Sequence, residues 1–336
     1  MGRICVYGAG SIGCYVGGRL LAAGADLCFV GRPAMGRELG EHGLSLTDYR
    51  GGHWSLNGGY VHFGDMALAA EADLVLVTVK SAATARAASE LALVLKPGAL
   101  VLSLQNGLGN AEILRDALPG HTVLAGMVPF NVVQRGGGAF HQGSEGELHA
   151  QSDPALRPWL ALFVKAGLPL QLHRDMQSVL WGKLLLNLNN PVNALADLPL
   201  KTELSQRDYR RCLALAQGEA LGLLHEAGIH PAKLTPLPAA WLPRLLDVPD
   251  TLFRRLASSM LAMDPLARSS MSDDLAAGRT TEIDWINGEV VKLAERLGQR
   301  APVNARLCAL VREAEQSESR PAWSGPALLK ELQAAG

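Results

Sequence analysis

The sequence predicts an α/β fold in which a parallel sheet with helices on both faces comes first and an all-helical domain follows. Strand-like and helix-like segments alternate through the first third of the chain, and such alternation is typical of a parallel sheet. Beyond about residue 175 the patterns are helical. A length of 336 residues suits about two domains of roughly 150 residues each. We therefore predict one domain over residues 1–174 and a second over residues 175–336.

Short runs of apolar residues predict the strands of the first domain. The clearest is the uninterrupted run DLVLVTV at 73–79, which is bounded by polar residues as buried parallel strands are. Three consecutive glycines mark residues 134–143 as a hairpin or a loop. The other predicted strands lie at 3–8, 26–30, 100–104 and 123–128, with helices at 11–23 and 82–95.

The second domain is predicted to consist of helices joined by short connections. Five prolines between positions 231 and 249 predict an irregular connection in its middle, because proline interrupts helical hydrogen bonding. The apolar spacing predicts helices at 176–196, 207–227, 251–263, 282–297 and 304–316.

Composition excludes several classes of protein. With 31 Lys+Arg against 32 Asp+Glu, the net charge of −1 favours neither nucleic acid nor an anionic membrane as a partner. An apolar content of 48% excludes long disorder. There is neither an apolar run of about 18 residues nor a signal-peptide pattern at the start. The five scattered cysteines form no CxxC pair, so we predict no metal site and a cytoplasmic location.

A glycine-rich motif follows the first predicted strand and opens the first helix. The pattern is GxGxxG, in which the first glycine permits the turn, the second lets a pyrophosphate approach, and the third allows close helix–strand packing. The free N–H groups of the helix N-terminus then face the phosphates. This context predicts a dinucleotide site in a Rossmann-type domain. Its residues are Gly8, Ala9, Gly10, Ser11, Ile12 and Gly13.

The ends of the following strands indicate which dinucleotide binds. An NAD site usually has Asp or Glu at the end of the second strand, whereas this chain has Arg32. A guanidinium there can bind a 2′-phosphate, so NADP is favoured over NAD. Lys80 and Asn106 end two further strands, where ligands of open α/β sheets bind. Taken singly, each of the two could equally be an ordinary loop residue.

A polar stripe crosses an apolar segment of the predicted helix at 176–196. Lys183, Asn187 and Asn190 are four and three residues apart, which would place them on one helix face. Such groups need partners or water among the surrounding leucines. The stripe is therefore either a row of donors lining a cleft between the domains or a solvated or helix-bridging face.

A second polar cluster lies near residues 269–288. Thr281 with Asp284 resembles a capping box, which would explain both residues structurally. Glu282 is expected on the inward flank of the predicted helix, where its carboxylate needs a cation such as Lys183. Ser270 is either a site residue or an N-cap.

With these residues in view, the chain resembles the ketopantoate reductase (2-dehydropantoate 2-reductase) family. The resemblance runs from the glycine motif to the APVNARL segment near residue 301. It rests on the order and spacing of several motifs together. These are GxGxxG, the arginine after the second strand, VTVK, QNG, W-x-K-x-x-x-N, SSM and TEIDWINGE.

The resemblance implies reduction of the ketone of ketopantoate to D-pantoate with NADPH, a step in pantothenate and coenzyme A synthesis. It implies a Rossmann domain and a helical domain with the site in the cleft between them. It makes Lys183 the general acid and Glu282 its partner at the nicotinamide end. The remaining roles it implies are substrate binding by Asn187, Asn190 and Ser270, contact of Asn106 with substrate and nicotinamide, 2′-phosphate binding by Arg32 and Lys80, and a backbone cofactor contact at Val132.

Two departures from the family pattern keep alternatives open. The family often spaces its two asparagines one residue further apart, so Asn189 or Asn193 are alternatives to Asn190 as the second substrate asparagine. The family often has a substrate-contacting asparagine in a P-N-G-like segment, where this chain has LPLK at 198–201. The alternatives are therefore a paralogous reductase of another 2-keto acid and, from a different class, a non-catalytic NADP-binding protein. Whether the chain forms a homodimer is left open by the sequence.

Overall fold

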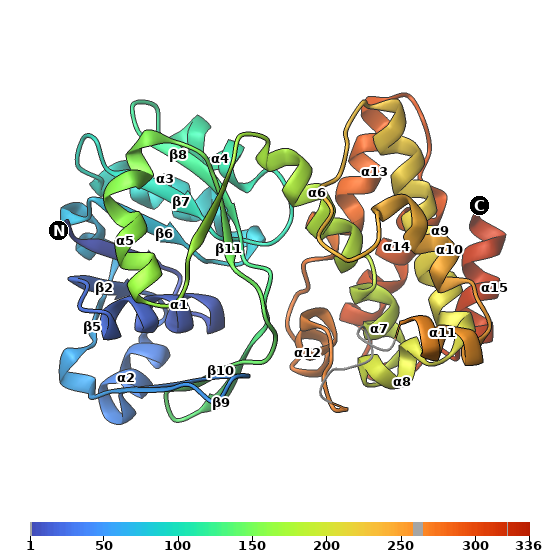
Figure 1. Cartoon of the computed structure of the whole chain (residues 1–336), viewed down its shortest axis with the longest axis horizontal. Coiled ribbons are helices and arrows are strands. Elements are labelled where there is room, and N and C mark those ends of the chain that lie inside the picture. The colour runs from blue at the N-terminus through green and yellow to red at the C-terminus, as the bar shows by residue number, and fades with distance from the viewer. Residues whose placement is uncertain (1, 258–264, 321) are drawn as a thin grey trace. The chain divides into compact units, whose positions relative to one another are not determined.

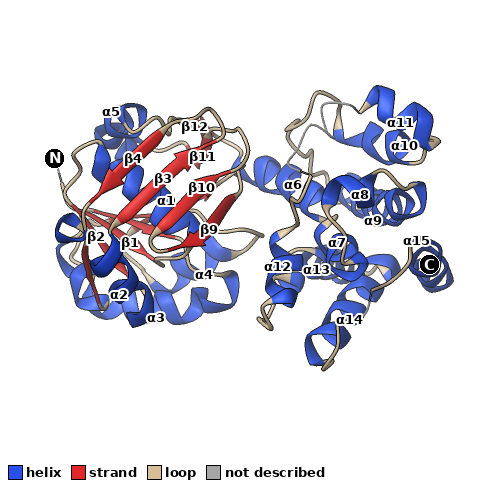
Figure 2. Cartoon of the chain, turned by 90° about the horizontal axis from the view of Figure 1, so that it is seen from below, coloured by secondary structure: helices blue, strands red, loops and turns tan. Residues whose placement is uncertain are grey.

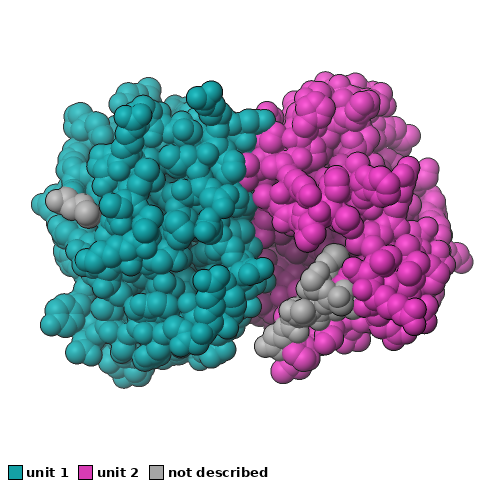
Figure 3. Space-filling view, viewed as in Figure 1, with its two compact units in different colours: residues 1–176 teal, residues 177–336 magenta. Residues whose placement is uncertain are grey.

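The computed structural model describes residues 2–257, 265–320 and 322–336 (Figure 1). The chain divides into two compact units, Met1–Met176 and Gln177–Gly336, which are coloured separately in Figure 3. The strands described lie in unit 1, and unit 2 is built from helices. The predicted fold class, a parallel-sheet domain followed by a helical one, is confirmed.

The centre of unit 1 is an eight-stranded sheet. Its order is β12-β11-β8-β7-β6-β1-β2-β5, and all neighbouring strands are parallel except β11 and β8. The stretch from β5 to β8 has the strand order of a Rossmann fold, with its switch point between β1 and β6. The strands are β1 (Ile4–Tyr7), β2 (Leu27–Val30), β5 (His62–Gly64), β6 (Leu74–Val77), β7 (Leu100–Ser103), β8 (Thr122–Met127), β11 (Leu148–Gln151) and β12 (Leu170–His173).

The central strands are apolar throughout because both faces of the sheet are covered. Along β1, Ile4 and Val6 pack into one hydrophobic cluster, while Cys5 and Tyr7 pack into another. Successive side chains of a strand point to opposite faces, so a strand between two layers carries no polar side. The helices of unit 1 are α1 (Ser11–Ala22), α2 (Pro33–His42), α3 (Thr84–Val94), α4 (Asn110–Ala117) and α5 (Arg157–Lys165).

Unit 1 also contains a four-stranded sheet, which the sequence revealed only in part. Its order is β4-β3-β10-β9, and Figure 2 shows it as a separate layer with α1 beside it. The hairpin predicted near its glycines is β9 and β10, but β3 and β4 were not predicted. Both are short and partly exposed, so they lack the apolar run of a buried strand. The strands are β3 (Leu44–Asp48), β4 (His53–Leu56), β9 (Val132–Gly136) and β10 (Ala139–Gln142).

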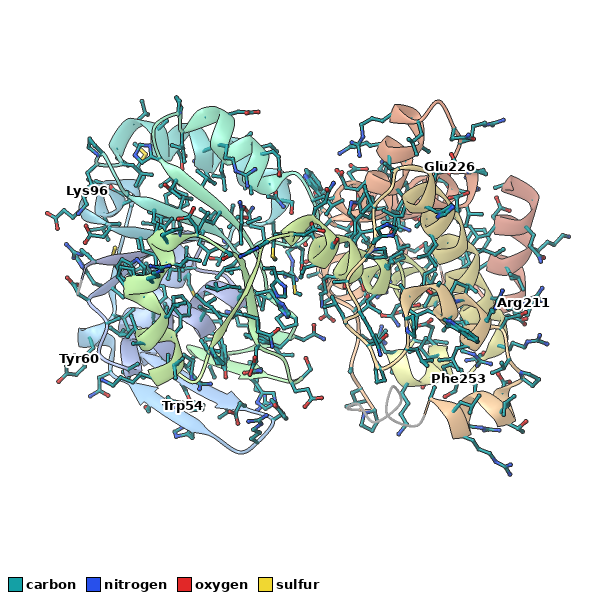
Figure 4. All side chains as sticks on the ribbon, turned by 45° about the horizontal axis from the view of Figure 1, so that its top comes forward. Trp54, Tyr60, Lys96, Arg211, Glu226 and Phe253 are labelled. Carbon is teal, nitrogen blue, oxygen red and sulfur yellow. The ribbon has the colours of Figure 1, made fainter. Side chains whose placement is uncertain are left out.

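Helix α1 lies between the two sheets and is therefore buried on opposite sides. A side chain at Gly17 would strike Phe29 of β2, and one at Gly18 would strike Leu46 of β3. The buried Arg19 on this helix stacks on Trp54 of β4 at 3.5 Å from its ring centroid (Figure 4 labels Trp54). The glycines and the stacked arginine let one helix serve both layers.

Unit 2 confirms the predicted all-helical character but corrects several helix boundaries. The long helix predicted at 176–196 is two helices, α6 and α7, with Leu188 and Asn189 between them. The helix predicted at 282–297 begins only at Asn287, after the 3-10 turn η6. The helix predicted at 251–263 is α11 as far as Leu256, and residues 258–264 lie outside the described part of the chain. The irregular connection predicted from the prolines at positions 231 to 249 contains α10.

Helix α9 contacts several of the other helices of unit 2. Its Arg210 is fully buried, and the guanidinium lies 4.1 Å from the ring centroid of Phe253 (Figure 4 labels Phe253). No helix among the described residues is both long and apolar enough to span a membrane. The helices are α6 (Met176–Asn187), α7 (Asn190–Ala196), α8 (Leu200–Leu204), α9 (Arg207–Glu226), α10 (Leu242–Leu246), α11 (Asp250–Leu256), α12 (Ser270–Ala276), α13 (Asn287–Arg296), α14 (Pro302–Gln316) and α15 (Gly325–Ala335).

Candidate functional site

The glycine motif forms a tight turn between β1 and α1. Gly8 has φ +120°, a conformation that side-chain-bearing residues rarely adopt, and a Cβ there would lie 2.5 Å from the Val79 nitrogen. At Gly13 a Cβ would lie 2.2 Å from the Gly8 carbonyl oxygen. The Thr78 hydroxyl donates to that same carbonyl at 2.7 Å. The first and third glycines are thus required by the turn and by the packing of helix against strand.

The second glycine is different, because nothing lies where its side chain would be. No heavy atom of the described residues is within 4 Å of a Cβ built on Gly10, the N-cap of α1. The first turn of α1 has neither a side-chain cap nor an acidic residue. The N–H groups of Ser11, Ile12 and Gly13 therefore have no acceptor within the helix. An open backbone edge with a positive dipole end fits a pyrophosphate, so these residues suit a dinucleotide.

Arg32 and Lys80 lie beyond the carboxyl ends of β2 and β6. Arg32 is exposed at the N-cap of α2, and its guanidinium makes no hydrogen bond or ion pair with the described residues. The turn is joined to this strand end, because Gly8 and Ala9 both donate N–H groups to the Val30 carbonyl, at 2.9 and 3.0 Å. Lys80 is exposed at the start of the 3-10 turn η3 (Ser81–Ala83). Both cations thus follow strands that border β1.

Asn106 follows β7 and is held by a buried polar network. Its carbonyl accepts from the Ser81 hydroxyl at 2.8 Å and from Asn110 Nδ2 at 2.7 Å. Gln105 donates to the Val79 carbonyl at 3.0 Å and so joins the ends of β6 and β7. The supporting roles of Ser81, Gln105, Asn110 and Thr78 were not predicted from the sequence. Ser81 and Asn110 carry no motif of their own, although their positions after strand ends were a signal.

Val132 is the first residue of β9, the edge strand of the smaller sheet, and pairs with Gln142 of β10. Its backbone is therefore held in register by the hairpin. The described contacts do not link Val132 to the glycine turn, so its role stays a prediction from the resemblance.

Lys183 is on α6, one turn before the end of that helix at Asn187. The residue is partly exposed, but protein surrounds its ammonium group. This burial lowers the pKa of Lys183 from its usual 10.5 to about 8, because the charged form loses hydration. An ammonium with such a pKa is largely protonated at pH 7 and releases its proton readily.

The break between α6 and α7 changes the predicted polar stripe. Asn187 ends α6 and Asn190 begins α7, so the two are not on one continuous helix face as predicted. Both are partly exposed. Asn189 and Asn193 are instead buried, and their amides donate to the Glu203 carboxyl at 3.0 and 3.3 Å. The two alternative asparagines are therefore engaged within unit 2.

Ser270 opens α12 but does not cap it. The N-cap is Ser269, whose hydroxyl accepts from the Ser272 N–H at 3.1 Å. The alternative prediction, that Ser270 is an N-cap, was therefore wrong by one residue. Ser269 also donates to the Asn190 carbonyl at 3.3 Å. The structure thus brings Asn190 and Ser270 together through Ser269, and Ser270 is exposed.

Glu282 precedes the turn η6 (Ile283–Trp285), not a regular helix as predicted. The predicted capping box does not form, because the Thr281 N–H donates to Glu315 at 2.7 Å and Asp284 pairs with Arg312, although the Thr281 hydroxyl accepts from the Ile283 N–H. Glu282 is partly exposed. Its role beside Lys183 stays a prediction.

Two family models match the chain, one in each of its two compact units. A family model described as "Ketopantoate reductase PanE/ApbA" matches residues 4–154, and its C-terminal counterpart matches residues 175–315. The chain belongs to this family. The predicted resemblance is therefore confirmed.

Individual relatives match over nearly the whole length. The chain is 29% identical to a 2-dehydropantoate 2-reductase of Halobacterium salinarum, covering 94% of this chain and 99% of that protein. A crystal structure of a PanE/ApbA family ketopantoate reductase from Ralstonia eutropha has a TM-score of 0.79 and 30% identity, covering 93% of this chain and 98% of that one. D-mandelate dehydrogenase with NADH and anilino(oxo)acetate has a TM-score of 0.77, with the same coverage, at 19% identity. The last likeness concerns the fold alone.

The family uses a nicotinamide dinucleotide, and the turn from Gly8 to Gly13 is where the residues of this chain fit one. Among the described residues, no group of three or more His, Cys, Asp or Glu side chains is arranged to hold a metal ion.

Proposed function

We propose that the protein is an NADPH-dependent 2-dehydropantoate 2-reductase, which reduces the ketone of ketopantoate to D-pantoate in pantothenate and coenzyme A synthesis. The observation that carries this proposal is Lys183, an ammonium with a pKa lowered to about 8 in a chain of this family. We propose that unit 1 binds the dinucleotide and that unit 2 supplies the proton donor and the groups for the keto acid. The five buried, unpaired cysteines support a reducing, cytoplasmic location.

The choice of NADP over NAD rests on Arg32. Its guanidinium is exposed beyond β2 and makes no ion pair with the described residues, so it is available to a phosphate. A 2′-phosphate would receive two charge-assisted hydrogen bonds from one guanidinium. We propose Lys80 as a second cation for the same phosphate, and Val132 as a backbone contact.

The bound dinucleotide supplies a hydride from C4 of its nicotinamide. The residues of the chain bind this dinucleotide: the first turn of α1 offers three N–H groups to the pyrophosphate, and we propose that Asn106, whose carbonyl is fixed by two hydrogen bonds, contacts the nicotinamide. As the ketone oxygen gains negative charge, the Lys183 ammonium stabilises it and donates a proton to it. We propose that Glu282 orients Lys183 and, by its charge, favours the protonated form.

Asn187, Asn190 and Ser270 are proposed to bind the keto acid. Amide N–H and hydroxyl groups can donate to a carboxylate and to a substrate hydroxyl. Asn190 is preferred over Asn189 and Asn193 because it is partly exposed, whereas the other two donate to Glu203 inside unit 2.

A second candidate is reduction of a different 2-keto acid. The observation that favours it is the segment at 198–201, where Leu200 replaces the polar residue expected from the family pattern. The Leu200 N–H donates to the Ala267 carbonyl at 2.8 Å, which brings two apolar residues together close to Ser270 in sequence. A leucine side chain cannot hydrogen-bond to a substrate hydroxyl as an asparagine can, so an apolar substituent would suit this position better.

A substrate panel tests the proposal. The purified chain is assayed with NADPH and with NADH against ketopantoate and a series of 2-keto acids with apolar and aromatic side chains. We expect the highest kcat/KM for NADPH with ketopantoate. A higher kcat/KM for an apolar keto acid would select the second candidate, and dinucleotide binding without turnover would select a non-catalytic role.

A further inference from the structure

Glu203 on α8 is a fully buried carboxyl group that the proposed reaction does not use. Its Oε2 accepts from Asn189 Nδ2 at 3.0 Å and from Asn193 Nδ2 at 3.3 Å. Both donors are neutral amides, and none of the described cations pairs with the group. An ionised carboxylate in such a place loses its hydration and gains no compensating cation. The neutral acid is therefore favoured.

Two unsatisfied atoms indicate where the proton is. Glu203 Oε1 and Asn189 Oδ1 are both buried and have no hydrogen-bond partner among the described residues. Both are acceptors if the carboxyl is ionised, so neither can satisfy the other. A proton on Oε1 makes it a donor, and Oδ1 is the free acceptor of the amide already bonded to Oε2. A carboxylic acid and an amide can then form two parallel hydrogen bonds, and a single proton satisfies both atoms.

The groups around Glu203 do not supply a compensating charge. Arg210, one helix away, pairs with Asp250 at 2.8 Å. Burial raises the pKa of Glu203 to about 8, although the two amide donors act in the opposite direction. The proximity of Glu203 contributes to raised pKa values of Tyr209 and Cys212. Helix α7 carries no titratable side chain. The other titratable and charged groups on α8 and the first two turns of α9 are Lys201, Arg207, Asp208, Tyr209, Arg210, Arg211 and Cys212.

The partners of Glu203 lead to the proposed substrate residues. Asn189 lies in the break between α6 and α7, directly before Asn190. Asn193 donates to Glu203, and its Oδ1 accepts from the Ser269 N–H at 2.9 Å. Ser269 in turn donates to the Asn190 carbonyl at 3.3 Å and caps the helix that Ser270 opens. One carboxyl group therefore joins the break and the start of α12.

We propose that Glu203 is a neutral carboxylic acid, hydrogen-bonded edge to edge with Asn189, which positions Asn190 and Ser270 for the keto acid. Glu203 is a positioning residue and touches neither substrate nor dinucleotide. The positioning role of Glu203 rests on the proposed function, whereas its protonation state does not.

Infrared spectroscopy of the full chain tests the proton directly. The spectrum of wild type minus that of Glu203→Gln at pH 7 should contain the carbonyl stretch of a protonated carboxylic acid. Raising the pH should remove this band with a midpoint near 8. A difference spectrum at pH 7 that contains only carboxylate bands would overturn the proposal.

Glu219 of α9 provides a matched control for that spectrum. Its carboxyl accepts from the N–H groups of Val303 and Asn304 at 3.0 and 2.9 Å and from Asn304 Nδ2 at 2.7 Å. Each of these contacts is a donor, as a carboxylate requires, and neither oxygen is left unpartnered. The spectrum of wild type minus Glu219→Gln should therefore contain carboxylate bands at pH 7. A protonated-acid band there as well would show that the method does not single out Glu203.

Steady-state kinetics test the positioning role. Glu203→Ala should raise KM for the keto acid about tenfold or more while kcat changes less, and Glu203→Gln should restore most of the loss at pH 7. Above pH 8 KM should rise in wild type but not in Glu203→Gln. Equal losses in the two variants would contradict a role for the neutral acid. If no keto acid is turned over, the proposed function fails, while the infrared band still decides the protonation state.

Discussion

The glycine turn of unit 1 and the break between α6 and α7 in unit 2 are built by opposite means. The turn depends on missing side chains: at Gly8 and Gly13 the backbone comes so close that a Cβ would lie within 2.5 Å of a neighbouring atom. The break depends on side chains that are present, since Asn189 and Asn193 both donate to Glu203. A turn made of backbone leaves a short motif, whereas a break held by distant side chains leaves none.

The difference has a chemical consequence. A dinucleotide presents the same pyrophosphate in every protein, so a backbone cradle suits it wherever the turn occurs. A keto acid is recognised by individual donors, and their positions follow from the network behind them. Changes in the two regions should therefore affect different functional quantities: cofactor affinity in unit 1, and turnover and KM in unit 2.

The largest effect is expected at Lys183. Lys183→Ala should lower kcat by about 10²–10⁴-fold, the usual contribution of a general acid, while NADPH affinity changes little. In wild type, kcat/KM should fall as the pH rises above about 8, because only the protonated ammonium can act as an acid. The pH dependence of kcat/KM and the dinucleotide Kd by fluorescence titration check both points.

The control is Lys330→Ala, which removes an exposed lysine from α15 in the same unit and should leave kcat unchanged. Full activity of Lys183→Ala with a wild-type circular dichroism spectrum would end the assignment of this lysine as the proton donor.

The glycine turn should separate stability from affinity. Gly13→Ala should destabilise the fold by about 1–3 kcal/mol, because its Cβ would overlap the Gly8 carbonyl oxygen. Gly10→Ala should fold normally but weaken dinucleotide binding about tenfold or more, because its Cβ occupies the open space at the helix N-terminus. Thermal unfolding and dinucleotide titration measure the two effects.

Gly218→Ala is the matched control for the glycine variants. Gly218 is exposed within α9 and has open space around it, so alanine should stabilise the chain by about 0.5–1 kcal/mol. If Gly10→Ala instead lost stability as Gly13→Ala does, the distinction between an open and a packed glycine would be wrong.

The Glu203 carboxyl should make stability depend on pH. Its folded-state pKa of about 8 is above the usual 4.5, so the folded chain binds more protons than the unfolded chain between these values. Its contribution is therefore full below pH 4.5 and decreases as the pH rises to about 8, by roughly 1.4 kcal/mol per pH unit within that range. Between pH 6 and 8 wild type should lose about 2–3 kcal/mol relative to Glu203→Gln. Urea unfolding of both at each pH measures this difference, and parallel curves would contradict the buried proton.

The change at Arg32 should affect the binding of only one of the two dinucleotides. Arg32→Ala should weaken NADPH binding about 10–100-fold, from the loss of charge-assisted hydrogen bonds, and leave NADH binding nearly unchanged. Arg37→Ala, an exposed arginine of the same helix, is the control and should change neither. Equal weakening of NADPH and NADH by Arg32→Ala would remove the 2′-phosphate role.

The elements that could be predicted from the sequence are those whose structure depends on one local rule. The apolar strands and the glycine turn follow from burial and from the geometry of residues such as Gly8, so their positions were predicted to within a few residues. The elements that were not predicted correctly are those whose structure depends on residues distant in the sequence. The break at Leu188 and Asn189 is held by Glu203, and the later start of α13 follows a turn at Glu282–Trp285, although both segments have helical apolar spacing. Strand β3 pairs with β10, almost a hundred positions away, and β4 joins the smaller sheet through its pairing with β3.

Transfer of a labelled hydrogen from NADPH to ketopantoate is the sharpest test of the proposed reduction. The chain is incubated at pH 7 with ketopantoate and NADPH that carries deuterium at the transferred position of nicotinamide C4, and the product is analysed by mass spectrometry and chiral chromatography. We expect D-pantoate with one deuterium at C2 and one NADPH consumed per product molecule. Recovery of unchanged ketopantoate, from a folded chain that binds NADPH, would contradict it.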